Sequence, residues 1–428
     1  MNTSTTRALV LGSEHPRSAA VLRSLARSGI PVDLADHYEP PTALWQGSRY
    51  VRDRMLLDEE PGRAVEMLIR RGKPEGGLLV PTNDHYLIMA SRHHEALSKT
   101  FTVTVPPWDI LGPLMDKVEA CRIAREAGLE VPHHYRPSNA EELDRILADL
   151  DFEDRAYVLK IRMWDTGAAD AQTLRRVAQA GSDAATLRAK CEAIRESTGE
   201  YPLIEEVVPG TADRCIGVSM IVDKNHEPVV AYCARRLKLQ LYAKGDFKHP
   251  YELGANAYCE SMHDPEAIEL ATRFVRHARF TGAITVELKR DAIDSRLKFI
   301  KADCRFVRAT GLSTSIGLDM PTALYRIYTG VNTELPPQKT YPAGVNWIWL
   351  EAYAYSLWKN RRNISLTREV WDLLKRLRKV RSWAYFDWRD PLPSIILALT
   401  VRRRLKLLES AGTRTATPGG KMERSVSG

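Results

Sequence analysis

The chain has 428 residues, of which 44% are hydrophobic and 27% are charged, and its formal net charge is +8. This balance is that of an ordinary folded protein with core enough for two or three structural units, which excludes a disordered chain. No apolar run approaches the length of a membrane span, and the positive charge does not by itself identify nucleic acid as a partner.

Cysteine usage and the N-terminus indicate the compartment. The six cysteines are scattered, with no C-x-x-C motif and no Cys/His spacing typical of a metal site. This usage is typical of reduced, mostly buried thiols. The N-terminus leads straight into a strand-like run and lacks the apolar core of a signal peptide. We therefore expect a cytoplasmic protein without a transmembrane segment.

The first 112 residues have the pattern of an α/β domain with a parallel sheet, because short apolar runs alternate with a helical pattern. The expected elements are a helix at 18–28 and strands at 7–12, 30–35, 77–82 and 102–105. The strand at 77–82 leads into a loop at Asn83 and Asp84. We place the end of this domain near Leu111.

Residues 113–330 mix helices with antiparallel strands and predict an α+β core of two lobes, about 113–200 and 201–330. The expected helices are 116–127, 140–150 and 265–278, and the expected strands are 157–161, 203–208, 216–222, 229–235, 283–289 and 297–303. Asp264 is the expected N-cap of the third helix. Residues 331–410 predict a helical extension, and 411–428 have the composition of a disordered tail.

The strand pair near residue 300 carries the first candidate chemistry. Alternate residues of a strand share a face, so Lys301, Asp303 and Arg305 should point together. A hairpin turn at 291–295 would place Glu287 opposite Lys301 or Asp303. Two carboxylates at this separation can hold Mg²⁺, and the cations beside them can neutralise phosphoryl oxygens. A salt-bridged, solvated strand face has the same pattern, so both interpretations stay open.

Two lysines occupy positions that a bound phosphate would explain. Lys160 ends an apolar strand, where a charge is costly unless it meets an anion. Lys117 begins a helix, which is the unfavourable end of the helix dipole for a cation. Either side chain could instead simply extend to solvent.

Two further segments are open to the same pair of interpretations. The strand at 203–208 ends in a turn and can offer backbone groups to an adenine edge, or it can be an edge strand with exposed glutamates. Arg235 to Lys238 forms a cationic patch suited to a phosphate or a carboxylate, and a solvated charge run looks the same.

The order and spacing of these motifs resemble the ATP-grasp superfamily, and most closely its carboxylate–amine ligase branch. The resemblance covers about Gly12 to Tyr328. It rests on Met115-Asp116-Lys117, Val158-Leu159-Lys160, Ile204-Glu205-Glu206-Val207-Val208-Pro209-Gly210, Arg235-Arg236-Leu237-Lys238, Val286-Glu287-Leu288-Lys289-Arg290-Asp291 and Phe299-Ile300-Lys301-Ala302-Asp303-Cys304-Arg305-Phe306.

The resemblance implies an ATP site at the first half of this series. Lys117 and Lys160 would contact the ATP phosphates, and Lys160 would also lie near the adenine. The segment that holds the adenine would be Glu205, Glu206 and Val207. Asp213 is a looser candidate for a ribose contact.

The second half of the series implies the catalytic residues. Arg235 and Lys238 would lie over the phosphates or an acyl phosphate. Glu287 and Asp303 would hold Mg²⁺, and Arg305 would stabilise the phosphoryl group during transfer, with Lys301 beside it. The implied reaction joins a small-molecule carboxylate to an amine through an acyl phosphate.

This sequence departs from the family pattern at two places. The last motif of the family usually reads Glu-x-Asn-Pro-Arg, whereas here Lys301 and Asp303 take the places of the glutamate and the asparagine. The glycine-rich loop after Lys160 has only Gly167. Asp303 can take over ligation while Lys301 replaces one of two metal ions, or two-metal catalysis is lost. The second reading leads to a non-catalytic nucleotide- or metabolite-binding protein.

The region after residue 331 is rich in tryptophan and arginine. Such interleaving can indicate stacking on nucleic acid, although packing onto the core is the preferred interpretation and no nucleic-acid partner is expected. The segment 393–408 ends in basic residues and can be a membrane-surface helix, a docking helix or a dimer contact. A homodimer is therefore a possible assembly.

Overall fold

The computed structural model describes residues 6–13, 15–37, 44, 47–72, 76–160, 183–245, 251–331, 340–359 and 365–399. Gly167, the C-terminal end of the segment 393–408 and the tail from 411 lie outside the described residues. None of the helices in these ranges is long and apolar enough to cross a bilayer. All six cysteines are free thiols, and only Cys215 among them is not fully buried, as the sequence predicted.

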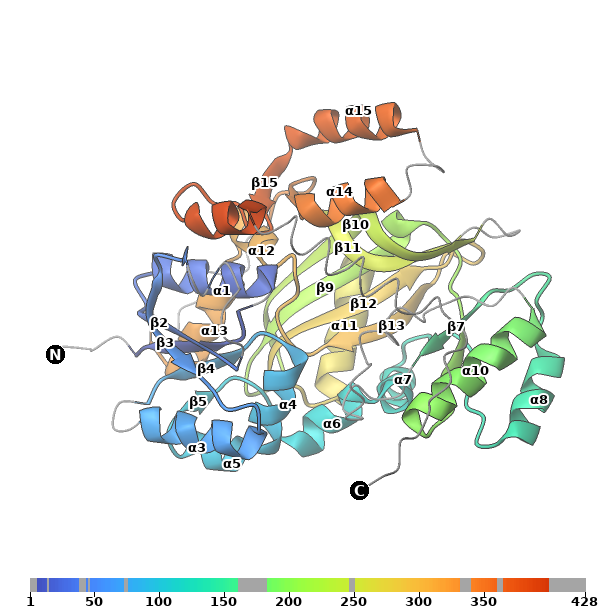
Figure 1. Ribbon diagram of the computed structural model, residues 1–428, viewed down its shortest axis with the longest axis horizontal. Helices are drawn as coiled ribbons and strands as arrows, with labels where there is room; N and C mark the ends of the chain where they lie inside the picture. Colours follow the sequence, from blue (N-terminus) through green and yellow to red (C-terminus); the bar gives the residue numbers. More distant parts are fainter. Residues whose placement is uncertain are drawn as a thin grey trace, which may run out of the picture.

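The N-terminal unit is a parallel sheet in the order β3-β2-β1-β4-β5 (Figure 1). Its strands are β1 Ala8–Leu11, β2 Val32–Asp36, β3 Val51–Leu56, β4 Leu78–Pro81 and β5 Thr102–Val103. Its helices are α1 Pro16–Arg27, α3 Pro61–Gly72, α4 Asp84–Arg92 and α5 His94–Ser98. Every residue of β1, β2 and β4 is buried, as expected of parallel strands covered on both faces.

Two helices connect this sheet to the next unit, α6 Trp108–Met115 and α7 Lys117–Glu126. A small lobe follows, made of β6 His134–Tyr135, α8 Ala140–Asp149, β7 Tyr157–Lys160, α10 Ala184–Thr198 and β8 Leu203–Glu206. Its antiparallel sheet has the order β6-β8-β7, so β8 belongs to this lobe although it lies beyond residue 200. Leu143, Leu159 and Ile204 are part of a separate small core here.

The centre of the molecule is a seven-stranded sheet in the order β13-β12-β9-β10-β11-β14-β15. Its strands are β9 Cys215–Val222, β10 Pro228–Gly245, β11 Tyr251–Met262, β12 Gly282–Arg290, β13 Leu297–Asp303, β14 Asn346–Ile348 and β15 Val380–Trp383. The short helix η2 Ala212–Arg214 precedes β9, and α11 Pro265–His277 connects β11 to β12. The side chain of Asp264 caps α11 by accepting from Ala267 N, as predicted.

The C-terminal part is helical only in part. It contains α14 Leu350–Lys359, α15 Leu366–Leu377 and a helix at 392–399, but β14 and β15 join the central sheet, which the sequence analysis did not predict. The same part packs on the N-terminal unit, where α12 Gly311–Ser315 and α13 Met320–Thr329 also lie. The buried carboxylate of Asp390 accepts a hydrogen bond from Arg23 Nε of α1 at 3.0 Å.

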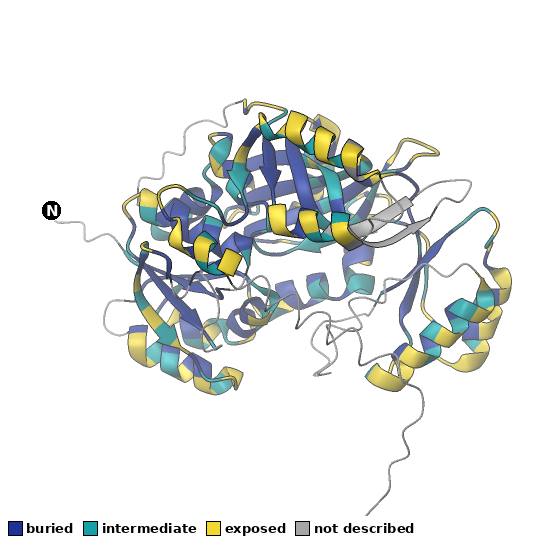
Figure 2. Cartoon of the chain, turned by 45° about the horizontal axis from the view of Figure 1, so that its top comes forward, coloured by how far each residue is buried: buried dark blue, intermediate teal, exposed yellow. Residues whose placement is uncertain are grey.

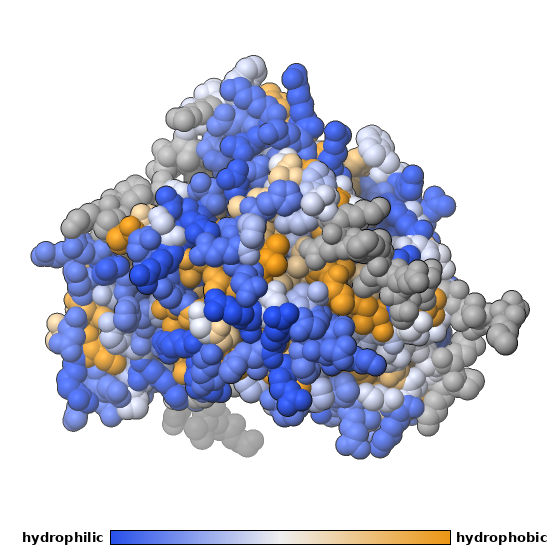
Figure 3. Space-filling model, turned by 180° about the vertical axis from the view of Figure 1, so that it is seen from behind, coloured by the Kyte–Doolittle hydropathy of each residue, from blue (hydrophilic) through white to orange (hydrophobic). Residues whose placement is uncertain are grey.

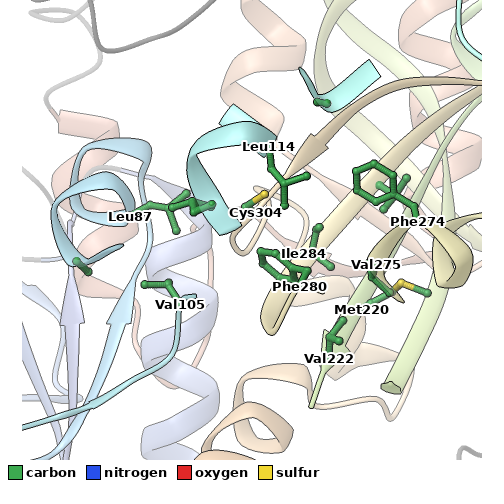
Figure 4. Packing of buried hydrophobic residues seen from close by; sticks show 14 of the residues in the cluster. Leu87, Val105, Leu114, Met220, Val222, Phe274, Val275, Phe280, Ile284 and Cys304 are labelled. Atoms are coloured by element: carbon green, nitrogen blue, oxygen red, sulfur yellow. The ribbon is translucent and has the colours of Figure 1, made fainter. Parts of the chain in front are cut away.

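The main hydrophobic core lies between the N-terminal unit and the central sheet. The strands of the central sheet are mostly buried, whereas exposed residues gather on the outer faces of the helices (Figure 2). Leu114 of α6 and Cys304 lie between Leu87 of the N-terminal unit and Phe274 of α11 in one apolar cluster (Figure 4). From behind, the surface is largely hydrophilic, with hydrophobic side chains gathered near its middle (Figure 3). The N-terminal sheet and the central sheet therefore share one core.

Candidate active site

The hairpin of β12 and β13 brings the predicted acidic and basic residues together. Glu287 lies directly opposite Lys301, and Thr285 lies opposite Asp303. Lys301 Nζ is 2.8 Å from an oxygen of Asp303 and 3.7 Å from an oxygen of Glu287. The predicted pairing of these strands is confirmed, and one ammonium group bridges both carboxylates.

A third cation at this hairpin is Arg236, which the sequence analysis did not select. Its guanidinium forms an ion pair with Glu287. Burial disfavours the charged form of Arg236, but the charge of Glu287 outweighs this and raises the pKa of the guanidinium. The contact reaches across β9 at Gly217, which pairs with Glu287 on one side and with Ala234 on the other.

Three of the predicted site residues have their contacts elsewhere. Arg235 points to the opposite face of β10 and donates from Nε to Glu260 at 2.6 Å. Lys238 lies 2.9 Å from Glu369 of α15. Asp213 is exposed in η2 and accepts from Thr211. Within the described residues, the structure gives none of the three a contact with Glu287 or Asp303. Arg235 and Lys238 are thus paired with Glu260 and Glu369 in this structure, and their expected contact with phosphates or an acyl phosphate stays a prediction.

The two predicted lysines approach the hairpin from other elements. Lys160, at the end of β7, forms an ion pair with the buried Glu205 of β8. Lys117 is the first residue of α7, after the N-cap Asp116. Burial, followed by the charges of Lys160 and Lys301, lowers the pKa of Lys117 to about 7, although Glu205 and Asp84 oppose this shift. Lys117 is therefore within electrostatic reach of both other lysines.

The predicted adenine segment lies at the end of β8. The side chain of Glu206 points to the opposite side of β8 from that of Glu205. It forms an ion pair with Arg155 at 2.5 Å. That side lines a surface cavity of about 410 Å³ together with Val208 and Lys298. Val207 is buried, and its amide donates to the carbonyl of Ala156 at 2.8 Å. Its amide is therefore already used within the lobe.

Arg305 joins the hairpin to the N-terminal unit. Its Nε and Nη2 donate to the two carboxylate oxygens of Asp84 at 2.7 and 2.8 Å, and Asp303 is 3.6 Å away. Burial works against both charges, yet Arg305 holds the pKa of Asp84 below its ordinary value. The sequence analysis placed Asp84 in a loop but gave it no role. Its position after the carboxyl end of a parallel strand, where ligand-binding residues gather in α/β sheets, was the available signal.

The donor set fits one Mg²⁺ better than two. Glu287 and Asp303 lie diagonally across the hairpin and both contact Lys301, and Arg236 and Lys301 already balance their charges. Among the described residues there is no group of three or more His, Cys, Asp or Glu side chains suited to a metal ion. Mg²⁺ is usually held by one or two carboxylates together with substrate phosphates. These residues therefore fit an ion that arrives on a nucleotide.

Comparisons of sequence and of structure differ in what they find. No family model matches the sequence, and no curated protein sequence matches it. Among solved structures, the chain is similar to the biotin carboxylase domain of 2-oxoglutarate carboxylase from Hydrogenobacter thermophilus, which was solved with MgADP, ADP and bicarbonate. The identity is 14% over 80% of this chain and 74% of that chain, with a TM-score of 0.59.

Two further structures extend the comparison. N5-carboxyaminoimidazole synthetase from Staphylococcus aureus, complexed with ADP, is 12% identical over 80% of this chain and 82% of that one, with a TM-score of 0.57. L-amino acid ligase from Bacillus licheniformis is 15% identical over 78% of each chain, with a TM-score of 0.52. Similarity at these identities concerns the fold. The chain has the ATP-grasp fold, as its motif series predicted.

Proposed function

We propose that this chain, which has the ATP-grasp fold, is a ligase that uses ATP to join a carboxylate to an amine through an acyl phosphate. The observation that carries the proposal is the meeting of lysines from three elements. Lys117 of α7 lies within electrostatic reach of Lys160 on β7 and Lys301 on β13. Cations this close repel one another, and a polyphosphate is the ligand that relieves the repulsion.

Most of the charges around Lys117 form ion pairs with one another. Glu205 is paired with Lys160, Glu287 with Arg236, and Asp303 with Lys301. Lys117 belongs to the same group of charges, and its pKa of about 7 leaves it half charged near neutral pH. A triphosphate would restore its full charge. The similar structures that were solved with ADP support a nucleotide at this place.

The proposed reaction has two displacements. A carboxylate oxygen of the first substrate attacks the γ-phosphorus of ATP, the bond between that phosphorus and the β,γ-bridging oxygen breaks, and ADP leaves. The amine of the second substrate then attacks the acyl carbon, inorganic phosphate leaves, and the amine gives up a proton to solvent. Arg305 is fixed by Asp84 beside Asp303, where its guanidinium can stabilise the negative charge of the phosphoryl group.

Glu287 and Asp303 are the residues that would hold a nucleotide-borne Mg²⁺. When bound, the ion would neutralise phosphate oxygens and orient the polyphosphate. Lys301 supplies a fixed positive charge between the two carboxylates, where the ATP-grasp motif has a glutamate. We infer that this ammonium group takes the electrostatic place of a second ion.

A non-catalytic nucleotide-binding protein is the second candidate. The observation in its favour is that both carboxylates of the hairpin already have cationic partners. Such a protein would bind ATP without transferring its phosphate. The assay below separates it from the ligase.

The test uses hydroxylamine, which converts acyl phosphates into coloured hydroxamates. The purified full chain is incubated with MgATP, hydroxylamine and each of a panel of carboxylates. The ligase predicts hydroxamate and ADP in equal amounts with one class of carboxylate, and Glu287→Gln should lower the rate by ~100-fold. MgATP binding with no hydroxamate from any carboxylate would favour the second candidate.

The neighbouring arginines of β10 give a matched control. Arg236→Gln removes the partner of Glu287 and should lower the rate by ~10-fold or more. Arg235→Gln changes the same residue type on the opposite face and should leave the rate within about twofold. Equal losses in both variants would contradict the placement of the site on one face of the sheet.

A further inference from the structure

The start of α1 lies outside the proposed ATP site, and the residues just before it make specific contacts with neighbouring strands and loops. Gly12 has a φ of +96°, and a Cβ there would lie 3.0 Å from Thr82 Oγ1 and from Asn83 Nδ2, so the turn after β1 requires glycine. Ser13 N and Oγ both donate to Asp36 Oδ2, at 2.7 and 2.6 Å. The N-cap His15 makes no capping hydrogen bond through its side chain. Gly12 and Ser13, at the start of this turn, are therefore fixed by their neighbours.

Arg17, in the first turn of α1, is a buried cation. Arg17 is only 5% exposed. Within the described part of the chain, its Nε has no hydrogen-bond partner. Burial first, and then the charge of Arg305, lower the pKa of Arg17 well below its ordinary value, while Asp84 acts in the opposite direction. A buried guanidinium with an unused donor is costly unless an anion meets it.

The charged groups around Arg17 are two cations and two anions, so the charge of Arg17 itself is the one left over. Arg305, Arg308, Asp84 and Asp303 are the charged groups that act on it. Both carboxylates already have partners, because Asp84 binds Arg305 and Asp303 binds Lys301.

Two other groups beside Arg17 add no negative charge. Arg308 lies over the ring of Trp349 at 5.2 Å from its centroid, and the structure shows no acidic partner for it among the described residues. Burial, followed by Arg17 and Arg308, lowers the pKa of His15 to about 3, so its ring is neutral near pH 7. The charges of Arg17 and Arg308 thus both act on His15 at the N-terminus of α1, where the macrodipole adds further positive potential.

We propose that Arg17, Arg308 and the N-terminus of α1 bind a second anionic group, a phosphate or a carboxylate, on the substrate whose carboxylate is activated. The inference rests on the proposed function and narrows its substrate class to molecules with two acidic groups. Arg305 lies between the two places, since it contacts Asp303 on the catalytic side and acts on Arg17 on the other. The reacting carboxylate would thus lie near Arg305 while the second group is held at α1.

The test is calorimetric titration of the full chain with inorganic phosphate, succinate and acetate, each in the presence of a saturating non-hydrolysable ATP analogue with Mg²⁺. The analogue fills the triphosphate site, so the remaining binding reports on the second site. Phosphate or succinate should bind to the wild type, and acetate should bind at least tenfold more weakly. Preference for phosphate or for succinate identifies which of the two groups the substrate carries.

Two variants and a control make the result decisive. Arg308→Gln, at a half-buried position that tolerates change, should weaken the binding of the preferred anion at least tenfold, and Arg17→Lys should weaken it because a lysine lacks the planar fork. Arg273→Gln, at an exposed position of α11, removes the same charge far from α1 in sequence and should change nothing.

Absence of phosphate and succinate binding, or equal binding by wild type and Arg308→Gln, would overturn the inference. Loss of analogue binding together with Arg308-dependent binding of phosphate would instead refute the ATP site and leave the anion site standing.

Discussion

Lys117 makes the binding of ATP dependent on pH in a way that can be calculated. Its pKa in the free protein is about 7, whereas the ordinary value is 10.5. At pH 8 roughly one molecule in ten carries the proton on Lys117, from the titration equation with this pKa. Phosphates beside the ammonium group would return the pKa toward 10.5. Binding at pH 8 should therefore take up about 0.9 proton per ATP, and binding at pH 6 about 0.1.

The direction of the affinity change follows from the same numbers. Because the bound state needs the protonated lysine, ATP affinity should be constant below about pH 7 and fall as the pH rises above it. The expected loss is ~10-fold between pH 6 and pH 8. The wild type and Lys117→Met are titrated calorimetrically at pH 8 in buffers of different ionisation enthalpy. The slope of the observed heat against that enthalpy gives the number of protons.

The variant decides the interpretation. Lys117→Met should bind ATP more weakly and take up no proton at pH 8. A wild-type slope of zero would show that Lys117 does not meet the phosphates. A slope unchanged by Lys117→Met would assign the proton to another group, and the account of this lysine would be wrong.

Three further substitutions have expected outcomes. Lys301→Glu adds a third carboxylate to the hairpin and should raise the affinity for Mg²⁺ at least ~10-fold, so that Mg²⁺ raises the Tm of the variant but not that of the wild type. A variant Tm that does not respond to Mg²⁺ would contradict the role given to Lys301. Asp84→Asn leaves Arg305 without its buried partner and should lower the free energy of unfolding by about 3 kcal/mol in urea titration; a loss below about 1 kcal/mol would mean that this pair does not join the units. Asp390→Asn weakens the contact with Arg23 and should lower stability by a similar ~3 kcal/mol and expose the C-terminal part to limited proteolysis; unchanged cleavage would contradict a fixed C-terminal part.

The hairpin chemistry could be predicted from the sequence because local rules determine it. The turn at 291–295 and the alternation of side chains placed Glu287 opposite Lys301 or Asp303. In the structure a register shift between Glu287 and Leu288 brings Glu287 opposite Lys301. Lys117 and Lys160 were found in the same way, because each is a cation at a position that local structure makes unfavourable. These signals involve neighbours along the chain and needed no knowledge of tertiary contacts.

The choice between Arg235 and Arg236 was beyond such rules. Adjacent residues of a strand face opposite sides, and which side becomes the site depends on where other elements pack. Register shifts after Arg236 and after Lys238 disturb the alternation further, and α15 then takes Lys238 as a partner. The contact of Asp84 with Arg305 spans 221 residues of sequence, and no local pattern announces it.

The missed strands share a weak local signal. The segment of β11 contains Gly254 and two alanines, which have little preference for strands, and β15 lies in an arginine-rich stretch that favours helix. Both are strands because neighbouring strands supply the hydrogen bonds: β11 pairs with β10 over its whole length, and β15 pairs with β14. Tertiary pairing thus overrides local preference at these places.

Transfer of isotope from substrate to phosphate tests the central claim most directly. A carboxylate that yields hydroxamate is prepared with ¹⁸O in its carboxyl group and incubated with MgATP and the amine. An acyl-phosphate route transfers one carboxyl oxygen to inorganic phosphate, so phosphate carrying a single ¹⁸O is the predicted product. Unlabelled phosphate, or label appearing in AMP, would show that the carboxylate does not attack the γ-phosphorus and would contradict the account.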